Sequence, residues 1–378
     1  MEKKHHLYFD YLRVFAMLCV VFMHSATSVL WINPAGIGGN WLLVNCATSL
    51  AFSAVPLFFM MSGVLLFTSS KTPDASHLLK KRIPKLVIPL IFWSGIASLW
   101  LSLVQARGID IKGFLSLFGT AGSSSVMVHF WFMYTLIALY LISPFLHNGL
   151  NTLSAQGRRY LLVLLLLVLI ITTAQPLFPA DIQKYLPSKV FSELSVFGGH
   201  MVSFLLGWLL GSTERRIPNW LLLGVSVADI AFISVMTYRI TMKAGVYTQT
   251  FQSQSKGFEI LLAACIFLLF KQNLNRPFGH LNKAISPLTA LTFPIYLMHN
   301  IGISISAHLG IPRSNAIQVV LFTLVLTLVC YLVIKTMATI KPLCYATTGL
   351  SYETACSSFN WIHTLRRWKK RENNSQGS

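Results

Sequence analysis

The first apolar stretch of the chain contains three ionisable residues whose spacing suits chemistry on a charged substrate. Asp10, Arg13 and His24 all lie within residues 7–30, which are otherwise mainly apolar. In a helix, the step from Arg13 to His24 corresponds to about 16.5 Å of rise and a rotation within about 20° of three full turns. Their side chains are therefore expected on one face. Asp10 lies one turn before Arg13 and is placed to pair with its guanidinium.

These residue types suit a reaction between a charged donor and an acceptor hydroxyl. The guanidinium of Arg13 presents a fork of donors that fits an anionic or carbonyl group. A histidine such as His24 is neutral for much of the time near neutral pH and can remove a proton from a hydroxyl. The alternative is structural: Arg13 extends to a membrane interface and His24 makes an interhelical hydrogen bond.

Other polar and aromatic residues interrupt apolar stretches further along the chain. His129 opens the run His-Phe-Trp-Phe, which includes Trp131, and Tyr296 and His299 are three residues apart, so they share a helix face. We expect these four side chains to bind substrate. The alternative is that each histidine is a hydrogen-bonded interior residue.

Two acids in apolar surroundings, Asp229 and Glu259, are the ones best placed to meet a buried cation. The sequence alone does not pair them. No pair of histidines has ligand spacing on one helix with an acid nearby, so the sequence predicts no metal site.

The composition places these residues in a membrane protein. Of 378 residues, 54% are hydrophobic and 11% are charged, whereas soluble domains have roughly a quarter charged residues. This excludes a water-soluble globular fold. The net charge of +19 comes from short basic clusters between long apolar runs, which is the pattern of loops that orient a membrane protein. We therefore expect no nucleic-acid partner.

Ten apolar stretches predict an all-α polytopic membrane protein of about ten transmembrane helices. About 20 such residues are needed to cross the hydrocarbon core. The fifth, sixth and eighth stretches are short, and the sixth is rich in glycine. The stretches are 7–30, 45–68, 86–104, 129–147, 160–174, 197–211, 220–238, 258–270, 288–309 and 316–337.

The basic residues also predict an orientation. With a cytoplasmic N-terminus, 21 of the 30 Lys and Arg residues fall in cytoplasmic segments, eight fall outside, and Arg13 lies in the first span. This bias predicts that both termini are cytoplasmic and that the first stretch is a retained span. The helix face that carries Arg13 and His24, called the stripe below, then runs from the cytoplasmic interface to near the midplane of the membrane.

The chain is expected to form one membrane domain, residues 1–337, followed by a basic cytoplasmic tail, residues 338–378. The tail contains Trp361, Arg366, Arg367 and Trp368. Such a segment lies on an anionic membrane surface or is disordered.

Several motifs, in order, resemble the acyltransferase 3 family. The resemblance covers about residues 10–299 and is most similar to the enterobacterial common antigen O-acetyltransferase type, which has no attached extracytoplasmic domain. Val14 replaces the glycine that many members have after the arginine. The motifs are Asp-Tyr-Leu-Arg from Asp10 with His24, Val-Pro-Leu-Phe-Phe-Met-Met-Ser-Gly ending at Gly63, Lys-Lys-Arg-Ile-Pro from Lys80, His-Phe-Trp-Phe from His129, and Tyr-Leu-Met-His ending at His299.

The resemblance implies an integral membrane enzyme that O-acylates glycans, with an acyl-CoA donor, usually acetyl-CoA, entering from the cytoplasm. It implies that Arg13 and His24 are essential, and that Ser62 belongs to an adjacent substrate-binding motif. A basic run on the expected cytoplasmic side would attract the phosphates of coenzyme A or would only set topology. Its members are Lys80, Lys81, Arg82 and Lys85.

The sequence thus predicts an O-acetyltransferase of the bacterial inner membrane. It would move acetyl from acetyl-CoA to a hydroxyl of an envelope glycan or lipid-linked oligosaccharide. His24 is the expected general base and Arg13 positions the donor. Direct transfer and an acyl-enzyme route through Ser62 or His24 both remain open. The alternative function is a polysaccharide exporter or flippase without acyl transfer, although such transporters are expected to show inverted repeats or paired broken helices, which the sequence lacks.

Overall fold

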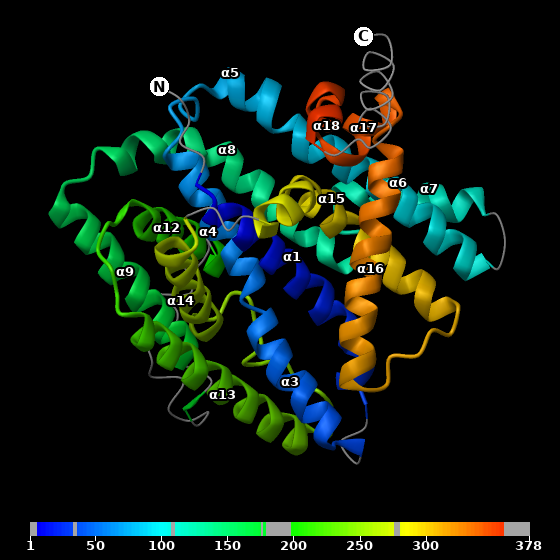
Figure 1. The fold of residues 1–378 in the computed structure, drawn as a ribbon, viewed down its shortest axis with the longest axis horizontal. Helices are drawn as coiled ribbons and strands as arrows, with labels where there is room; N and C mark the ends of the chain where they lie inside the picture. The colour runs from blue at the N-terminus through cyan, green and yellow to red at the C-terminus, as the bar shows by residue number, and fades with distance from the viewer. Residues whose placement is uncertain are drawn as a thin grey trace, which may run out of the picture. The chain divides into compact units, whose positions relative to one another are not determined.

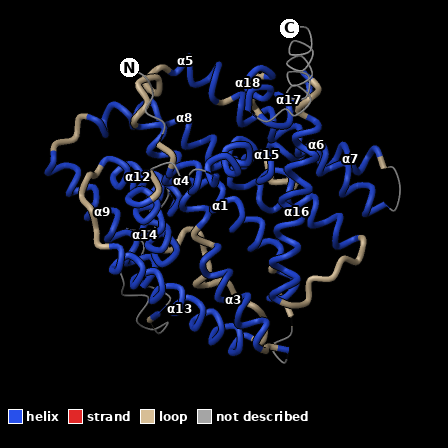
Figure 2. The backbone as a smooth tube through the Cα atoms, in the orientation of Figure 1, coloured by secondary structure: helices blue, strands red, loops and turns tan. Residues whose placement is uncertain are grey.

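The computed structural model describes residues 6–32, 36–106, 110–174, 177–178, 198–275 and 280–358. Within these ranges every regular element is a helix (Figure 2), so the prediction of an all-α fold is confirmed. The chain divides into two compact units. Unit 1 comprises Met1–Ala75, Leu139–Pro277 and Pro312–Thr323, and unit 2 comprises Ser76–Ala138, Phe278–Ile311 and Leu324–Ser378.

Unit 1 is built around α4 (Figure 1). Nearly all of its side chains are buried, because α1, α12 and α14 pack against it. Parts of α8 and α16 also belong to unit 1. The helices are α1 Tyr8–Ser25, α2 Thr27–Leu30, α3 Gly39–Ala51, α4 Ala54–Phe67, α8 Trp131–Asn151, α9 Ala155–Ala174, α12 Gly198–Ser212, α13 Asn219–Ala244, α14 Gly257–Asn273 and α16 Ala316–Met337.

Glycines allow α4 and α12 to approach closely. A Cβ added at Gly63 would overlap the backbone carbonyl of Phe204, and one added at Gly207 would overlap the backbone of Met60. Small residues at such crossings let helix backbones pack tightly in membranes. The glycine-rich sixth stretch is therefore a helix whose glycines face a neighbour.

Unit 2 is built around α6 and α15. α6 packs against α7, α15 and α17, and α15 also contacts α18 and the short helix before α8. Prolines lie inside both main helices, as is tolerated where neighbouring helices satisfy the freed backbone groups. The elements are a π-helix Leu78–Arg82, α6 Pro84–Ala106, α7 Ile111–Gly119, the 3₁₀ turns Thr120–Gly122 and Val128–Phe130, α15 His280–His308, α17 Lys341–Thr348 and α18 Tyr352–Ser358; α5 Ala75–His77 begins one residue before this unit.

The first part of the predicted tail folds onto a membrane helix. Trp93 of α6 donates its indole N–H to the carbonyl of Thr347, at 3.1 Å. Gly349 ends α17 with φ +69°, and its Cα lies against the carbonyl of Lys85, where a Cβ would overlap. Residues 338–358 are thus part of unit 2. Trp361, Arg366, Arg367 and Trp368 lie outside the described residues.

Helices lie in all ten predicted stretches, and within the described residues seven segments are long and apolar enough to cross a membrane. Apolar side chains such as Ile317, Leu321 and Val325 of α16 are exposed, as expected where a helix faces lipid. The helices α9, α12 and α14, which also cover predicted stretches, are not among these segments. The seven segments are Tyr8–Leu30, Gly39–Phe67, Ala75–Gln105, Val128–Asn151, Asn219–Ala244, Ile285–His308 and Ala316–Met337.

Candidate active site

Arg13 and His24 lie on one uninterrupted helix, α1, so the spacing expected from the sequence is kept. Both side chains are half-buried, as is Asp10 in the first turn. The residues between them that are fully buried include Met17 and Val21, and α1 packs against α3, α4 and α14. The stripe therefore lies beside a tightly packed apolar face.

His24 lies further along the helix than the expected midplane position. It is in the last turn of α1, six residues before the end of the Tyr8–Leu30 segment, or about 9 Å of helical rise. Its carbonyl accepts a hydrogen bond from Thr27 Oγ1, at 2.8 Å. The ring is therefore in the second half of the span, about 16.5 Å of rise from Arg13.

Ser62 belongs to α4, the helix against which α1 packs. Its side chain is half-buried, whereas Gly63 beside it faces Phe204 of α12. The two residues of this motif thus differ in surroundings. Gly63 sets the approach of α4 and α12, and Ser62 keeps an accessible hydroxyl in the same unit as His24.

In unit 2, the structure brings together three of the predicted substrate-binding residues. The hydroxyl of Tyr296 donates to the carbonyl of His129, although 167 residues separate them. The ring centroids of His129 and His299 are 4.6 Å apart, and all three side chains are buried. The face predicted from the spacing of Tyr296 and His299 therefore meets His129.

The hydrogen bonds indicate which ring nitrogen of each histidine donates. His129 Nε2 lies 3.1 Å from the carbonyl oxygen of Leu297, and because a carbonyl only accepts, Nε2 carries the proton. Nδ1 then accepts from the amide of Asn300, at 3.0 Å. His299 Nδ1 lies 2.5 Å from the carbonyl oxygen of Tyr296, which leaves the ring's lone pair on Nε2.

Asn300 is a member of this cluster that the sequence analysis missed. It is only 7% exposed and is four residues after Tyr296, so it shares the same helix face. That spacing was the available signal. Trp131 is half-buried at the start of α8, and its ring lies 6.3 Å from that of Phe132, which in turn contacts Tyr296.

The basic run lies at the start of α6. Lys80 and Lys81 are exposed and Arg82 is half-buried, all within the π-helical turn, and Lys85 is exposed in the first turn of α6. Short π-helical stretches are frequent at functional sites. The turn presents its lysines to solvent, as binding of coenzyme A phosphates would require.

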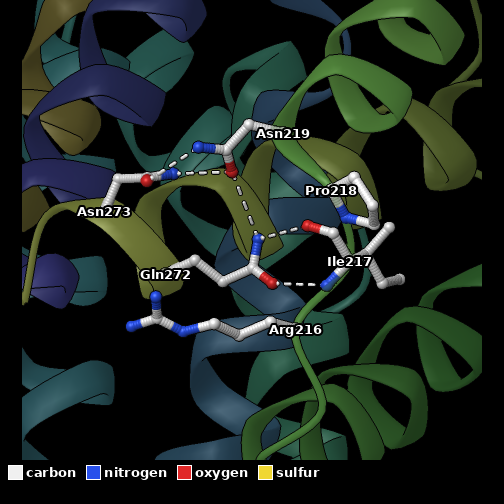
Figure 3. A pocket seen from close by; sticks show the side chains of 6 residues that line it. All are labelled: Arg216, Ile217, Pro218, Asn219, Gln272 and Asn273. Carbon is white, nitrogen blue, oxygen red and sulfur yellow. Dashed lines mark hydrogen bonds between the residues drawn. The ribbon is translucent and has the colours of Figure 1, made fainter.

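A cavity of about 310 Å³ lies at the start of α13 (Figure 3). The side-chain amide of Gln272 pairs with both backbone groups of Ile217, at 2.8 and 3.2 Å, and Asn219 and Asn273 exchange hydrogen bonds at 2.9 and 3.1 Å. A neighbouring cavity of about 270 Å³ is lined by His6, Arg215, Arg216 and Lys271, among others. None of the predicted site residues lines either cavity.

Within the described part of the chain, no group of three His, Cys, Asp or Glu side chains is placed to hold a metal ion. The arrangement instead offers hydroxyl, imidazole and guanidinium groups. These can bind an anionic donor, hold a hydroxyl group and accept a proton.

Comparisons with known proteins bear on this arrangement. No curated protein and no solved structure matches the chain. A family model described as an acyltransferase domain matches residues 6–335, which include every residue of the candidate site. The chain therefore belongs to the acyltransferase 3 family and is a multi-pass membrane acyltransferase.

Proposed function

We propose that the protein transfers an acetyl group from cytoplasmic acetyl-CoA to a hydroxyl of a cell-envelope glycan, in the bacterial inner membrane. The observation that carries the proposal is the pair Arg13 and His24, half-buried on one face of α1 in an acyltransferase domain. The half-buried guanidinium of Arg13 and imidazole of His24 are separated by about 16.5 Å of helical rise. This separation suits a donor that enters at one interface of the membrane and reacts deeper in the protein.

In this proposal, Arg13 holds an anionic or carbonyl group of the donor. His24 removes the proton of the acceptor hydroxyl while its oxygen forms a bond to the thioester carbonyl carbon. The carbon–sulfur bond breaks, and the coenzyme A thiolate leaves and takes up a proton. In an acyl-enzyme route, Ser62 or His24 would first accept the acetyl group.

The other predicted residues have supporting roles. The exposed lysines of the π-helical turn attract the phosphates of coenzyme A, and Asp10 orients Arg13. The cluster of His129, Tyr296 and His299 binds the acceptor, with Trp131 beside it, because buried hydrogen-bonding side chains and aromatic rings suit a sugar. The acceptor is an envelope glycan or a lipid-linked oligosaccharide.

Acetyl transfer by the purified full-length protein tests this function. Protein in lipid nanodiscs is incubated with acetyl-CoA labelled in the acetyl group and with a panel of envelope glycans. We expect label in a glycan ester and an equal amount of free coenzyme A thiol. Movement of a glycan across the bilayer of proteoliposomes without ester formation would instead support an exporter.

A further inference from the structure

The buried face of α13 is polar, although the helix is apolar overall. Its buried residues recur every three or four positions and include Ser226, Asp229, Thr237 and Thr241. Its exposed side is apolar, with Leu223 and Val227 among the exposed residues. Polar groups inside a membrane helix are expensive and mark functional sites by default.

Two buried carboxyl groups lie on the packed helices α13 and α14. Asp229 is 6% exposed and Glu259 is completely buried. The helices pack against each other, and the two carboxyl groups interact electrostatically. Among the described residues, neither oxygen of Glu259 has a hydrogen-bond partner, and neither has Asp229 Oδ2.

Among the residues that the structure describes, no cation offsets the charge of this pair. The groups that interact with it are Tyr247 and Cys265, neither of which is cationic. The helices packed against α14 also contain Arg13 and His24 of α1 and His200 of α12, but none of these acts on either acid. Two unpaired negative charges buried this close together would be very costly, so the pair needs a positive ligand.

Tyr247 interacts electrostatically with Glu259 but makes no hydrogen bond to it. Tyr247 lies in the loop between α13 and α14 and interacts with Glu259 and with Gln249, which is exposed. Burial raises the pKa of the Tyr247 hydroxyl, Gln249 opposes this by a hydrogen bond, and Glu259 adds to it. The hydroxyl therefore stays protonated and donates to Gln252 Oε1.

The Tyr247 hydroxyl is hydrogen-bonded instead to a buried polar cluster. The Gln252 amide donates to Asn45 Oδ1 and Ser49 Oγ, both at 2.9 Å, and all three side chains are buried. Ser234 of α13 bonds the hydroxyl of Ser49 at 3.0 Å. The cluster thus occupies the Tyr247 hydroxyl, which leaves Glu259 without a hydrogen bond from it.

We propose that Asp229 and Glu259 form a carboxyl pair that binds and releases a proton. A proton fits better than a metal ion, because no described group of three such ligands is placed to hold one. Glu259 also lies in the first turn of α14, where the helix macrodipole stabilises negative charge. The ionised form is therefore accessible and the proton can leave.

The test uses the full-length protein in nanodiscs and a hydrophobic carbodiimide, which adds to protonated carboxyl groups in apolar surroundings. Mass spectrometry should find the adduct at Glu259 or Asp229 at neutral pH, with labelling lost as the pH rises. The exposed acid Glu353 is the internal control and should stay unlabelled. Absence of labelling at every pH would overturn the proposal, as would protection by sodium but not by an equal concentration of potassium.

Infrared difference spectra give a second measurement. The carbonyl band of a protonated carboxyl should shift on transfer to D₂O, and Glu259→Gln should remove it while Glu353→Gln leaves it. If Glu259→Gln fails to fold, labelling and the D₂O shift of the wild type still decide whether the pair holds a proton.

Discussion

His24 is the residue on which the proposed chemistry depends most directly. His24→Ala is expected to lower acetyl transfer at least about a hundredfold, the scale of a lost general base. The initial rate with saturating acetyl-CoA measures this. His147→Ala is the matched control, because His147 is also half-buried in unit 1, and its rate should stay within about twofold. A near-normal rate for His24→Ala would leave the ring with a structural role.

Arg13 is proposed to bind the donor through the geometry of its guanidinium, and not through charge alone. Arg13→Lys keeps the charge but loses a bidentate contact. The KM for acetyl-CoA should rise about tenfold or more, since a hydrogen bond to a charged group contributes about 1.5–3 kcal/mol. Arg159→Lys, at an exposed position on α9, should change nothing. If both variants match the wild type, Arg13 only extends to the interface.

At the scale of elements, the contact between α4 and α12 depends on glycine. A methyl group at Gly63 would overlap the carbonyl of Phe204, and backbone cannot move aside without separating the helices. Gly63→Ala should therefore destabilise the protein by about 1–3 kcal/mol, as overpacking does. The thermal unfolding midpoint in detergent measures this loss.

Gly224→Ala is the control for that substitution. Gly224 lies on α13 with nothing within 4 Å of an added Cβ. Alanine there should leave the midpoint unchanged or raise it, since alanine favours a helix interior over glycine by up to about 1 kcal/mol. An equal loss of stability in both variants would contradict the close-packing argument.

The π-helical turn before α6 provides another prediction. Lys80 and Lys81 are exposed, and exposed charges are screened beyond about 8 Å at physiological salt. Neutralising both to glutamine should raise the KM for acetyl-CoA, and added salt should reduce the difference from the wild type. A salt-independent KM, identical in both proteins, would leave the lysines with topology alone.

The sequence predicted helices better than it predicted their ends or their long-range contacts. The stretch 45–68 was expected as one span, but it contains two helices, α3 and α4, separated at Phe52 and Ser53. α15 begins at His280, well before residue 288, because its first turns are polar and an apolar window does not detect them. A hydropathy window identifies segments whose side chains face lipid or the protein core, but it does not identify the residue at which a helix begins.

The candidate site shows the same difference between features that depend on local spacing and features that depend on long-range packing. Local spacing placed Arg13 and His24 on one face of α1, and Tyr296 and His299 on one face of α15, because these patterns depend only on helical geometry. The meeting of His129 with Tyr296 depends on packing between segments 167 residues apart. Nothing local in the sequence encodes that contact, whereas Asn300 was missed although its spacing from Tyr296 is a local signal.

At the scale of the whole molecule, contacts within unit 1 show that its loops gather in two groups, one at each end of α13 and α14. His6, Arg215 and Lys271 line one cavity, so the start of α1, the loop before α13 and the last turn of α14 are together. Trp31 and Tyr247 are in ring contact, with centroids 5.4 Å apart. These two lie at the other end, so α13 and α14 both run between the two ends.

Arg313 belongs to the second end as well. Its carbonyl accepts a hydrogen bond from Ser28, at 2.6 Å, and Asn40 contacts the start of α16. If the N-terminus is cytoplasmic, as the basic bias predicts, residues near Ser28, Tyr247 and Arg313 all lie outside. Between the loops at Gly36 and Arg313, the chain must then cross the membrane an even number of times. The helices α9, α12 and α14 are counted among these crossings.

Reporter fusions test that arrangement directly. Fusions after Gly36 and after Arg313 should score as extracytoplasmic, whereas fusions after Lys71 and at the C-terminus should score as cytoplasmic. Fusions are compared only where acetyl transfer or membrane insertion is retained, so that a misfolded chain is not scored. A cytoplasmic signal after Arg313 together with an extracytoplasmic one after Gly36 would contradict the arrangement, because the hydrogen bond between Ser28 and Arg313 holds both loops at the same end of unit 1.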